Sequence, residues 1–149
     1  MGEKIAIGSD HAAFEIKEAL KKRLRELGYD VEDFTRVKDG TGDYPDVAHP
    51  VADAVAKGVF PRAVLLCGAG HGMTYAANRH AGVRAALCLS VEFARLAREH
   101  NDSNILTMPG RAAPVDPHEK ILEAWLSTPF SGDERHRRRI RKIDHPDGS

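Results

Sequence analysis

Residues 62–72 read RAVLLCGAGHG, and this stretch decides the fold class. Ala63–Leu66 is a continuous apolar run, as expected for a central strand that is buried on both faces of a sheet. A glycine-rich loop, Gly68–Gly72, follows at once, and residues 73–79 are expected to form a short helix. A buried strand that leads through such a loop into a helix is typical of an α/β protein with a parallel sheet.

The rest of the chain repeats this alternation of short apolar runs with longer amphipathic ones. Further strands are predicted at residues 5–7, 30–33, 83–87 and 105–108, and further helices at 12–27, 45–57, 91–100, 116–126 and 134–143. The first helix has its apolar face at Phe14, Ile16, Leu20, Leu24 and Leu27. Right-handed crossovers between parallel strands place helices on both faces of the sheet. We therefore predict one domain over residues 1–149, with a three-layer, doubly wound, Rossmann-like fold around a five-stranded parallel sheet.

The composition excludes several classes of protein. The 22 basic residues balance the 22 acidic ones, so no overall charge attracts nucleic acid or an anionic membrane. The chain has neither a signal-peptide pattern nor an apolar run of the roughly 18 residues that a membrane helix needs. Its two cysteines, Cys67 and Cys88, lack metal or disulfide spacing, which indicates a reducing compartment. We expect a cytoplasmic protein that binds neither nucleic acid nor membrane.

Metal and cofactor dependence are not expected either. The eight histidines are scattered, and no pair at helical spacing is backed by carboxylates in the pattern of a zinc site. One local charge asymmetry stands out in the basic segment 134–143. The last residues, 144–149, are expected to be disordered.

In an open parallel sheet, ligands bind outside the carboxyl ends of the strands. That rule selects Asp10 and His11 after the first strand, Cys67 and the glycine loop after the third, and Arg111 after the fifth. His100 and Asn101 precede the fifth strand, so the same rule places them at the opposite edge. They can join the site only if a neighbouring subunit supplies them.

Two interpretations of the glycine loop and its cysteine remain open. Alternate glycines let backbone N–H groups converge on a phosphate or on the oxyanion of an enediolate, but tight packing also explains such glycines. Cys67 precedes this loop, where convergent N–H groups favour a thiolate that can remove a proton from carbon. It can equally be a buried, inert residue, as we expect for Cys88.

The remaining candidates are ambiguous when taken singly. Asp10 suits a helix N-cap as well as a proton shuttle between neighbouring sugar oxygens. His100 and Asn101 suit a helix end. Arg135 and Arg139 lie four residues apart on one helix face, where they can clamp a phosphate or simply face solvent.

Taken together, the motifs resemble the ribose-5-phosphate isomerase B family, whose relatives include the galactose-6-phosphate isomerase subunits. The resemblance covers residues 4–143 and rests on GSDHAAFEIK near the start, DYPDVA at 43–48, CGAGHGMTYAANRHAGVRA at 67–85, REHNDSN at 98–104, PGR at 109–111 and RHRRR at 135–139. It implies an aldose–ketose isomerase that interconverts ribose 5-phosphate and ribulose 5-phosphate through a cis-enediolate, without metal or cofactor.

The resemblance also implies a role for each candidate residue. Cys67 is the base, Asp10 shuttles the proton between oxygens, and His100 assists ring opening. The backbone of Gly68, Gly70 and Gly72 stabilises the enediolate; His11, Arg111, Arg135 and Arg139 surround the phosphate; and Tyr44, Ala69, His71 and Asn101 lie along the sugar. Members of the family are homodimers or homotetramers, with active sites shared between subunits.

Three residues depart from the family pattern. Ala69 stands where threonine or serine is usual, His71 where a small apolar residue is usual, and His80 where an aromatic residue is common. Ala69 and His71 leave a tetrose, allose or galactose phosphate open as the substrate. His71 is expected to point to the surface.

Two further alternatives belong to other classes. A flavodoxin-like nucleotide-binding module would need a phosphate-binding turn at Gly8–His11, and it gives Cys67 no task. An inactive member of the family would have lost Cys67, Asp10 or His100, and all three are present.

Overall fold

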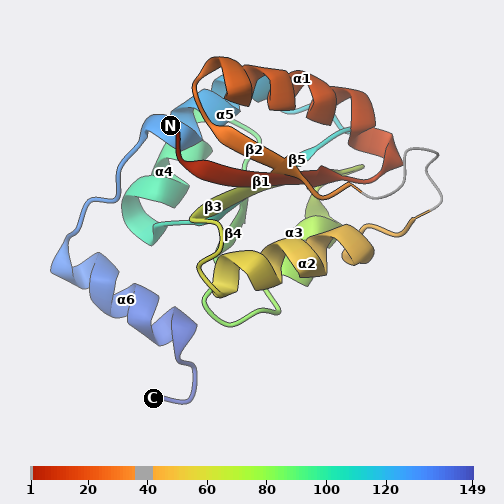
Figure 1. Cartoon of the computed structure of the whole chain (residues 1–149). Helices are drawn as coiled ribbons and strands as arrows, with labels where there is room; N and C mark the ends of the chain where they lie inside the picture. Colours follow the sequence, from red (N-terminus) through yellow and green to blue (C-terminus); the bar gives the residue numbers. More distant parts are fainter. Residues whose placement is uncertain (1, 36–41) are drawn as a thin grey trace.

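The computed structural model describes residues 2–35 and 42–149 and contains one five-stranded parallel sheet (Figure 1). The strands are β1 (Lys4–Ser9), β2 (Asp30–Asp33), β3 (Arg62–Cys67), β4 (Ala85–Leu87) and β5 (Ile105–Pro109), and their order in the sheet is β2-β1-β3-β5-β4. From β1 the chain runs outward to β2 and then returns to the other side of β1 to form β3. The order therefore reverses between β1 and β3, where open α/β sheets bind ligands.

Helices cover both faces of the sheet (Figure 1). They are the 3-10 helix η1 (His11–Ala13), α1 (Phe14–Glu26), α2 (Pro45–Ala56), α3 (His71–Ala77), α4 (Val91–Asn101), α5 (His118–Ser127) and α6 (Glu134–Asp144). One core packs α1, α4 and α5 on the sheet around Leu66 and Trp125, and the other packs α2 and α3 around Leu65 and Met73. The predicted three-layer fold and five-stranded parallel sheet are confirmed.

Some predicted boundaries were wrong for local reasons. The first helix opens with η1 because the Asp10 side chain accepts a hydrogen bond from the Ala13 N–H. β4 starts at residue 85 because the Arg84 N–H donates to the Asn104 side chain. Asp144, assigned to the disordered tail, is the last residue of α6. Most of the predicted loop at 35–43 lies outside the described residues.

Leu27, which was expected on the buried face of α1, is exposed. The buried face contains a lysine, Lys17, that the apolar pattern did not include. Lys17 is 1% exposed, and its Nζ donates to Oδ2 of Asp33 at 2.6 Å. The other oxygen of Asp33 accepts from the Thr35 N–H at 2.9 Å, and the Thr35 hydroxyl accepts from the Ser9 N–H at 3.1 Å. This chain of hydrogen bonds fixes the end of β1, directly before Asp10.

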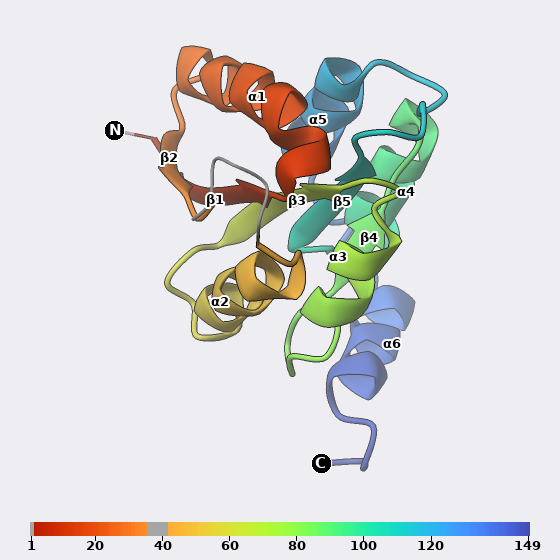
Figure 2. The ribbon, with the colours of Figure 1, turned by 90° about the vertical axis from the view of Figure 1, so that its right-hand side faces the viewer.

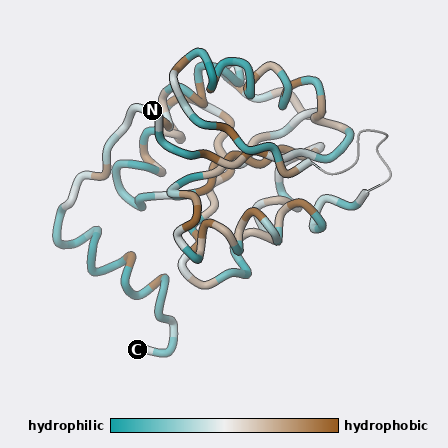
Figure 3. The backbone as a smooth tube through the Cα atoms, viewed as in Figure 1, coloured by the Kyte–Doolittle hydropathy of each residue, from teal (hydrophilic) through white to brown (hydrophobic). Residues whose placement is uncertain are grey.

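The last helix, α6, projects from the layered body (Figures 1 and 2). It is hydrophilic over nearly all its length (Figure 3), and it packs against the end of α4. Within residues 2–35 and 42–149, no helix has both the length and the hydropathy to cross a bilayer.

Candidate active site

Asp10 directly follows β1, and Cys67 ends the neighbouring strand β3, at the carboxyl edge of the sheet that faces the viewer in Figure 2. The pairing continues past the strand ends, because the Asp10 N–H donates to the Leu66 carbonyl at 3.2 Å. Oδ1 of Asp10 caps η1. Among the described residues, the other carboxylate oxygen of Asp10 has no hydrogen-bond partner. Capping therefore occupies only half of this carboxylate.

The two cysteines occupy different environments. Cys67 lies at the end of β3, 5% exposed, and its carbonyl accepts the Gly110 N–H at 2.8 Å. Cys88 follows β4, and burial raises the pKa of its thiol to about 12. Cys88 therefore stays protonated and cannot serve as a base near neutral pH. Its predicted inert role agrees with this environment.

Two carbonyls of the glycine loop accept hydrogen bonds from within the chain. The Gly68 carbonyl accepts from the backbone N–H groups of Gly110, Arg111 and Ala112 at 3.1, 2.9 and 3.2 Å. The Gly70 carbonyl accepts from the Thr74 hydroxyl at 2.7 Å. In a trans peptide the N–H points opposite to the C=O, so the N–H groups of Ala69 and His71 point away from these partners. This arrangement can form the predicted nest for an anion.

Two of the loop glycines approach their surroundings closely. Gly70 has φ +83°, which favours glycine, and a Cβ there would lie 2.5 Å from the Leu87 side chain. A Cβ on Gly72 would lie 2.4 Å from the Tyr44 ring. Tyr44 precedes α2, so this close approach places its ring directly over the loop.

The phosphate candidates of this edge also meet. A guanidinium nitrogen of Arg111 lies 3.4 Å from Nε2 of His11. His118, at the start of α5, contacts the Pro109 carbonyl at 2.6 Å and so supports the turn that carries Arg111. We call Asp10, His11, Tyr44, residues 67–72 and Arg111 the proximal group. His71 in this group is exposed, and its ring stacks on Tyr75 with centroids 6.0 Å apart.

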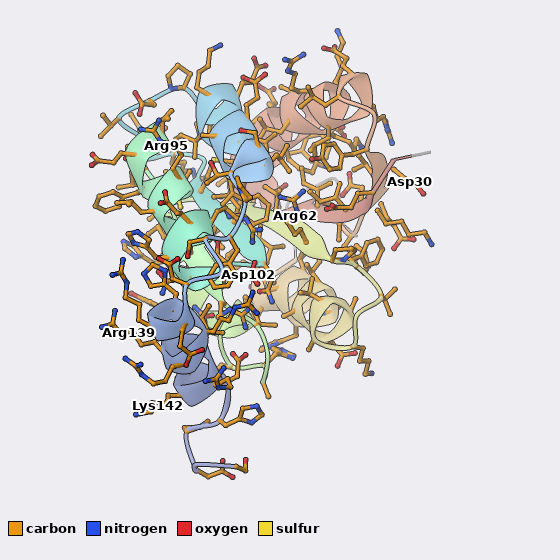
Figure 4. All side chains as sticks on the ribbon, turned by 90° about the vertical axis from the view of Figure 1, so that its left-hand side faces the viewer. Asp30, Arg62, Arg95, Asp102, Arg139 and Lys142 are labelled. Atoms are coloured by element: carbon orange, nitrogen blue, oxygen red, sulfur yellow. The ribbon has the colours of Figure 1, made fainter. Side chains whose placement is uncertain are left out.

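The other four candidates lie at the opposite edge of the sheet. His100 and Asn101 end α4 just before β5 begins, whereas Arg111 follows the end of β5. A strand of this length separates its two ends by roughly 15 Å. Arg135 and Arg139 lie on α6, and Figure 4 shows Arg139 on that helix, beyond the end of α4. We call these four residues the distal group; one chain does not bring them to the proximal group.

The proximal geometry and the order of the motifs agree with a comparison to known proteins. The model of the family described as Ribose/Galactose Isomerase matches residues 5–143. The chain belongs to this family.

Individual members of the family are similar over nearly the whole chain. Ribose-5-phosphate isomerase B of Escherichia coli is 38% identical, over 95% of this chain and 94% of the relative. The crystal structure of a ribose 5-phosphate isomerase from Thermotoga maritima is 50% identical with a TM-score of 0.90, over 97% and 99% of the two chains. That of Mycoplasma genitalium, solved with bound ribulose-5-phosphate, is 37% identical with a TM-score of 0.91, over 99% and 97%. The predicted family and enzyme class are confirmed.

In this isomerase, the structure adds a residue that the sequence analysis missed. His136 of α6 is buried, its ring centroid lies 4.6 Å from that of His100, and Ser131 contacts its Nδ1 at 2.8 Å. Burial lowers its pKa, as do the nearby charges of His100 and Arg135. A helical pattern was available as a signal, because His136, Ile140 and Ile143 recur at spacings of four and three residues.

Within residues 2–35 and 42–149, no three or more histidine, cysteine, aspartate or glutamate side chains are grouped to hold an ion. The chemistry that the proximal group itself offers is a thiol, a carboxylate and backbone N–H groups at one edge of the sheet.

Proposed function

We propose that this chain interconverts ribose 5-phosphate and ribulose 5-phosphate, as a homodimer or homotetramer whose sites combine the proximal group of one chain with the distal group of another. The observation that carries the proposal is the position of Asp10 and Cys67, which end adjacent strands beside the N–H groups of the glycine loop. A base, a proton shuttle and an oxyanion site are the three parts that this reaction needs.

The proposed steps balance without a metal or cofactor. The partner's distal group supplies His100, which assists opening of the furanose ring. The Cys67 thiolate then removes the proton from C2 of the aldose, and the electron pair moves toward C1 to give an enediolate with negative charge on O1. Backbone N–H groups of Ala69 and His71 stabilise that charge. Asp10 transfers the proton from O2 to O1, and Cys67 returns its proton to C1 to form the ketose.

The phosphate would be held from both chains. His11 and Arg111 lie together on the proximal side. The partner would add Arg135 and Arg139, which are four residues apart and therefore share one face of α6. Guanidinium groups suit this task because they bind phosphate oxygens with two parallel hydrogen bonds.

The face of α4 that carries His100 supports pairing with a second copy. Phe93, Leu96 and His100 recur at helical spacing on one face, and Phe93 is 59% exposed. A neighbouring face of α4 is already packed in the core through Ala94. On α3, beside the proximal group, Tyr75 is 64% exposed. A two-fold interface through these apolar side chains would bring each distal group to the partner's proximal group.

The test of the reaction follows ketose formation from four-, five- and six-carbon aldose phosphates. We expect ribose 5-phosphate to be turned over, Cys67→Ala to lose nearly all kcat, and the matched variant Cys88→Ala to keep it. Turnover of a different sugar phosphate would support the proposed reaction type and would show that the substrate is another sugar. An active Cys67→Ala enzyme would refute the role of the base.

The test of the shared site uses two inactive variants together. Cys67→Ala and His100→Asn are co-expressed, so that random pairing gives mixed dimers with one complete site in each. We expect about a quarter of the wild-type activity from a shared site of a two-fold dimer. A site built within one chain would stay inactive in every pairing, and that outcome would overturn the proposed sharing.

A further inference from the structure

Arg84, just before β4, contacts both elements that carry the distal group. Its Nε donates to the Asn101 carbonyl at 3.0 Å, and one terminal nitrogen donates to the Asp102 carbonyl at 3.1 Å. The other terminal nitrogen lies 2.9 Å from each carboxylate oxygen of Asp144, the last residue of α6. The Arg84 side chain is only 15% exposed, so these contacts are shielded from competing water.

The helix that this contact secures is unstable by its own composition. α6 has 11 residues, ERHRRRIRKID, and helices of that length are marginal in water without packing. Its many like charges repel one another, and Asp144 places a negative charge at the C-terminal end, where the helix dipole disfavours it. The position of α6 therefore depends on contacts outside the helix.

The structure supplies such contacts at both ends of α6. At the start, His136 packs beside His100, and the Ser131 N–H donates to the Glu99 carbonyl at 3.0 Å. At the end, one terminal nitrogen of Arg84 is shared between both carboxylate oxygens of Asp144. This contact is charge-assisted, and such hydrogen bonds are stronger than those between neutral groups. Both contact points involve the last turn of α4 or the residue after it.

We propose that Arg84 is a positioning residue, which acts with Asp144 to fix α6 against the end of α4 so that the four distal residues form one rigid group. This inference rests on the proposed function, because it concerns how the phosphate-binding arginines are presented to the partner chain. The mechanism assigns no chemical step to Arg84 or Asp144. Their effect is on the position of Arg135 and Arg139 relative to His100.

The test variant is Asp144→Ala, because it removes the contact without exposing the core. Alanine favours the helix more than aspartate does, so a loss of function would not come from a weaker intrinsic helix. We expect KM for the sugar phosphate to rise about fivefold while kcat stays within about twofold, because phosphate contacts bind substrate and transition state alike. The affinity for inorganic phosphate, measured by calorimetry, should fall by the same factor.

The matched control is Glu134→Ala, which removes another ion pair of the same helix. Glu134 lies 3.3 Å from Arg141, and both side chains are largely exposed. We expect this control to match the wild type in KM and in phosphate affinity. In an Arg84→Gln background, Asp144→Ala should add little further loss, because the two residues act as one contact.

Several outcomes would overturn the positioning role. One is an unchanged KM and phosphate affinity in Asp144→Ala, and another is an equal loss of phosphate affinity in Asp144→Ala and Glu134→Ala. A fall in kcat alone in Asp144→Ala, or a change in its oligomeric state by gel filtration, would also contradict the proposal. Failure of the proposed function is separate and visible in the wild type, which would then turn over no sugar phosphate. The phosphate titration needs no turnover and still reports the position of α6 in that case.

Discussion

Asp33→Asn is the substitution that most directly tests how the end of β1 is held. Burial by itself would raise the pKa of Asp33, but hydrogen bonds from Lys17, Lys21 and Thr35 outweigh it and lower the pKa from 3.8 to about 2. The Asp33 side chain is 20% exposed, so solvent screens these contacts only partly. Asparagine keeps the shape and removes the charge.

The size of the effect follows from the pKa. A folded-state pKa of about 2 against an unfolded value of 3.8 corresponds to about 2 kcal/mol of stability, at about 1.4 kcal/mol per pH unit. The pKa is lowered by folding, so this contribution is complete above pH 3.8 and is lost as the pH falls toward 2. Lys17 is left buried in Asp33→Asn with Glu18 still 3.5 Å away, which adds to the loss.

The assay is urea unfolding of Asp33→Asn and wild type at pH 7 and at pH 3. We expect the substitution to lower the free energy of unfolding by about 2–3 kcal/mol at pH 7. At pH 3, about half of the charge-dependent part of this loss should remain. Asp30→Asn is the matched control, because Asp30 is an exposed residue of the same strand (Figure 4). A loss that equals the control, or one that is the same at both pH values, would refute the electrostatic reasoning. Lys17→Met combined with Asp33→Asn should recover part of the loss, since no buried charge then remains.

Two further predictions concern the two halves of the site. Gly72→Ala places a methyl group against the ring of Tyr44, which is exposed enough to turn away. We expect KM to rise several-fold, while the free energy of unfolding falls by less than about 2 kcal/mol. Tyr44→Ala should give the same KM. The lowered pKa of His136 predicts that its ring titrates below the ordinary histidine value of 6.5 in an NMR pH series. Because folding lowers this pKa, the stability that the neutral ring allows is complete at pH 7 and is lost as the pH falls below 6.5. An ordinary titration of His136 would contradict the buried position of its ring.

The fold was predictable because its signals are local. Ala63–Leu66 is apolar without interruption, and each strand is followed by a helical pattern long enough for a crossover, so the layers and the parallel sheet follow. The strand-end rule then brought Asp10 and Cys67 together, and the structure places them on adjacent strands. In both cases the deciding residues are neighbours in sequence or end neighbouring strands.

The features that escaped prediction depend on pairs that are distant in sequence. Lys17 on the buried face of α1 is tolerated only because Asp33 of β2 meets it, and no pattern within the helix shows that partner. The Arg84–Asp144 contact joins residues 60 positions apart. A periodic hydrophobic pattern indicates which apolar side chains are buried, but it does not reveal charged residues that are buried as pairs.

The backbone of the proximal group also bears on which sugar fits. The reacting carbons would lie at the glycine loop and the phosphate near Arg111, and these two loops are joined directly, since the Gly68 carbonyl accepts three N–H groups from residues 110–112. The spacing between them is therefore a property of the backbone. The side chains of Ala69 and His71 are exposed and lie outside this junction. We infer that the two departures from the family pattern bear on contacts with hydroxyl groups and on rate, whereas the length of the sugar depends on this junction together with the arginines of the partner's distal group.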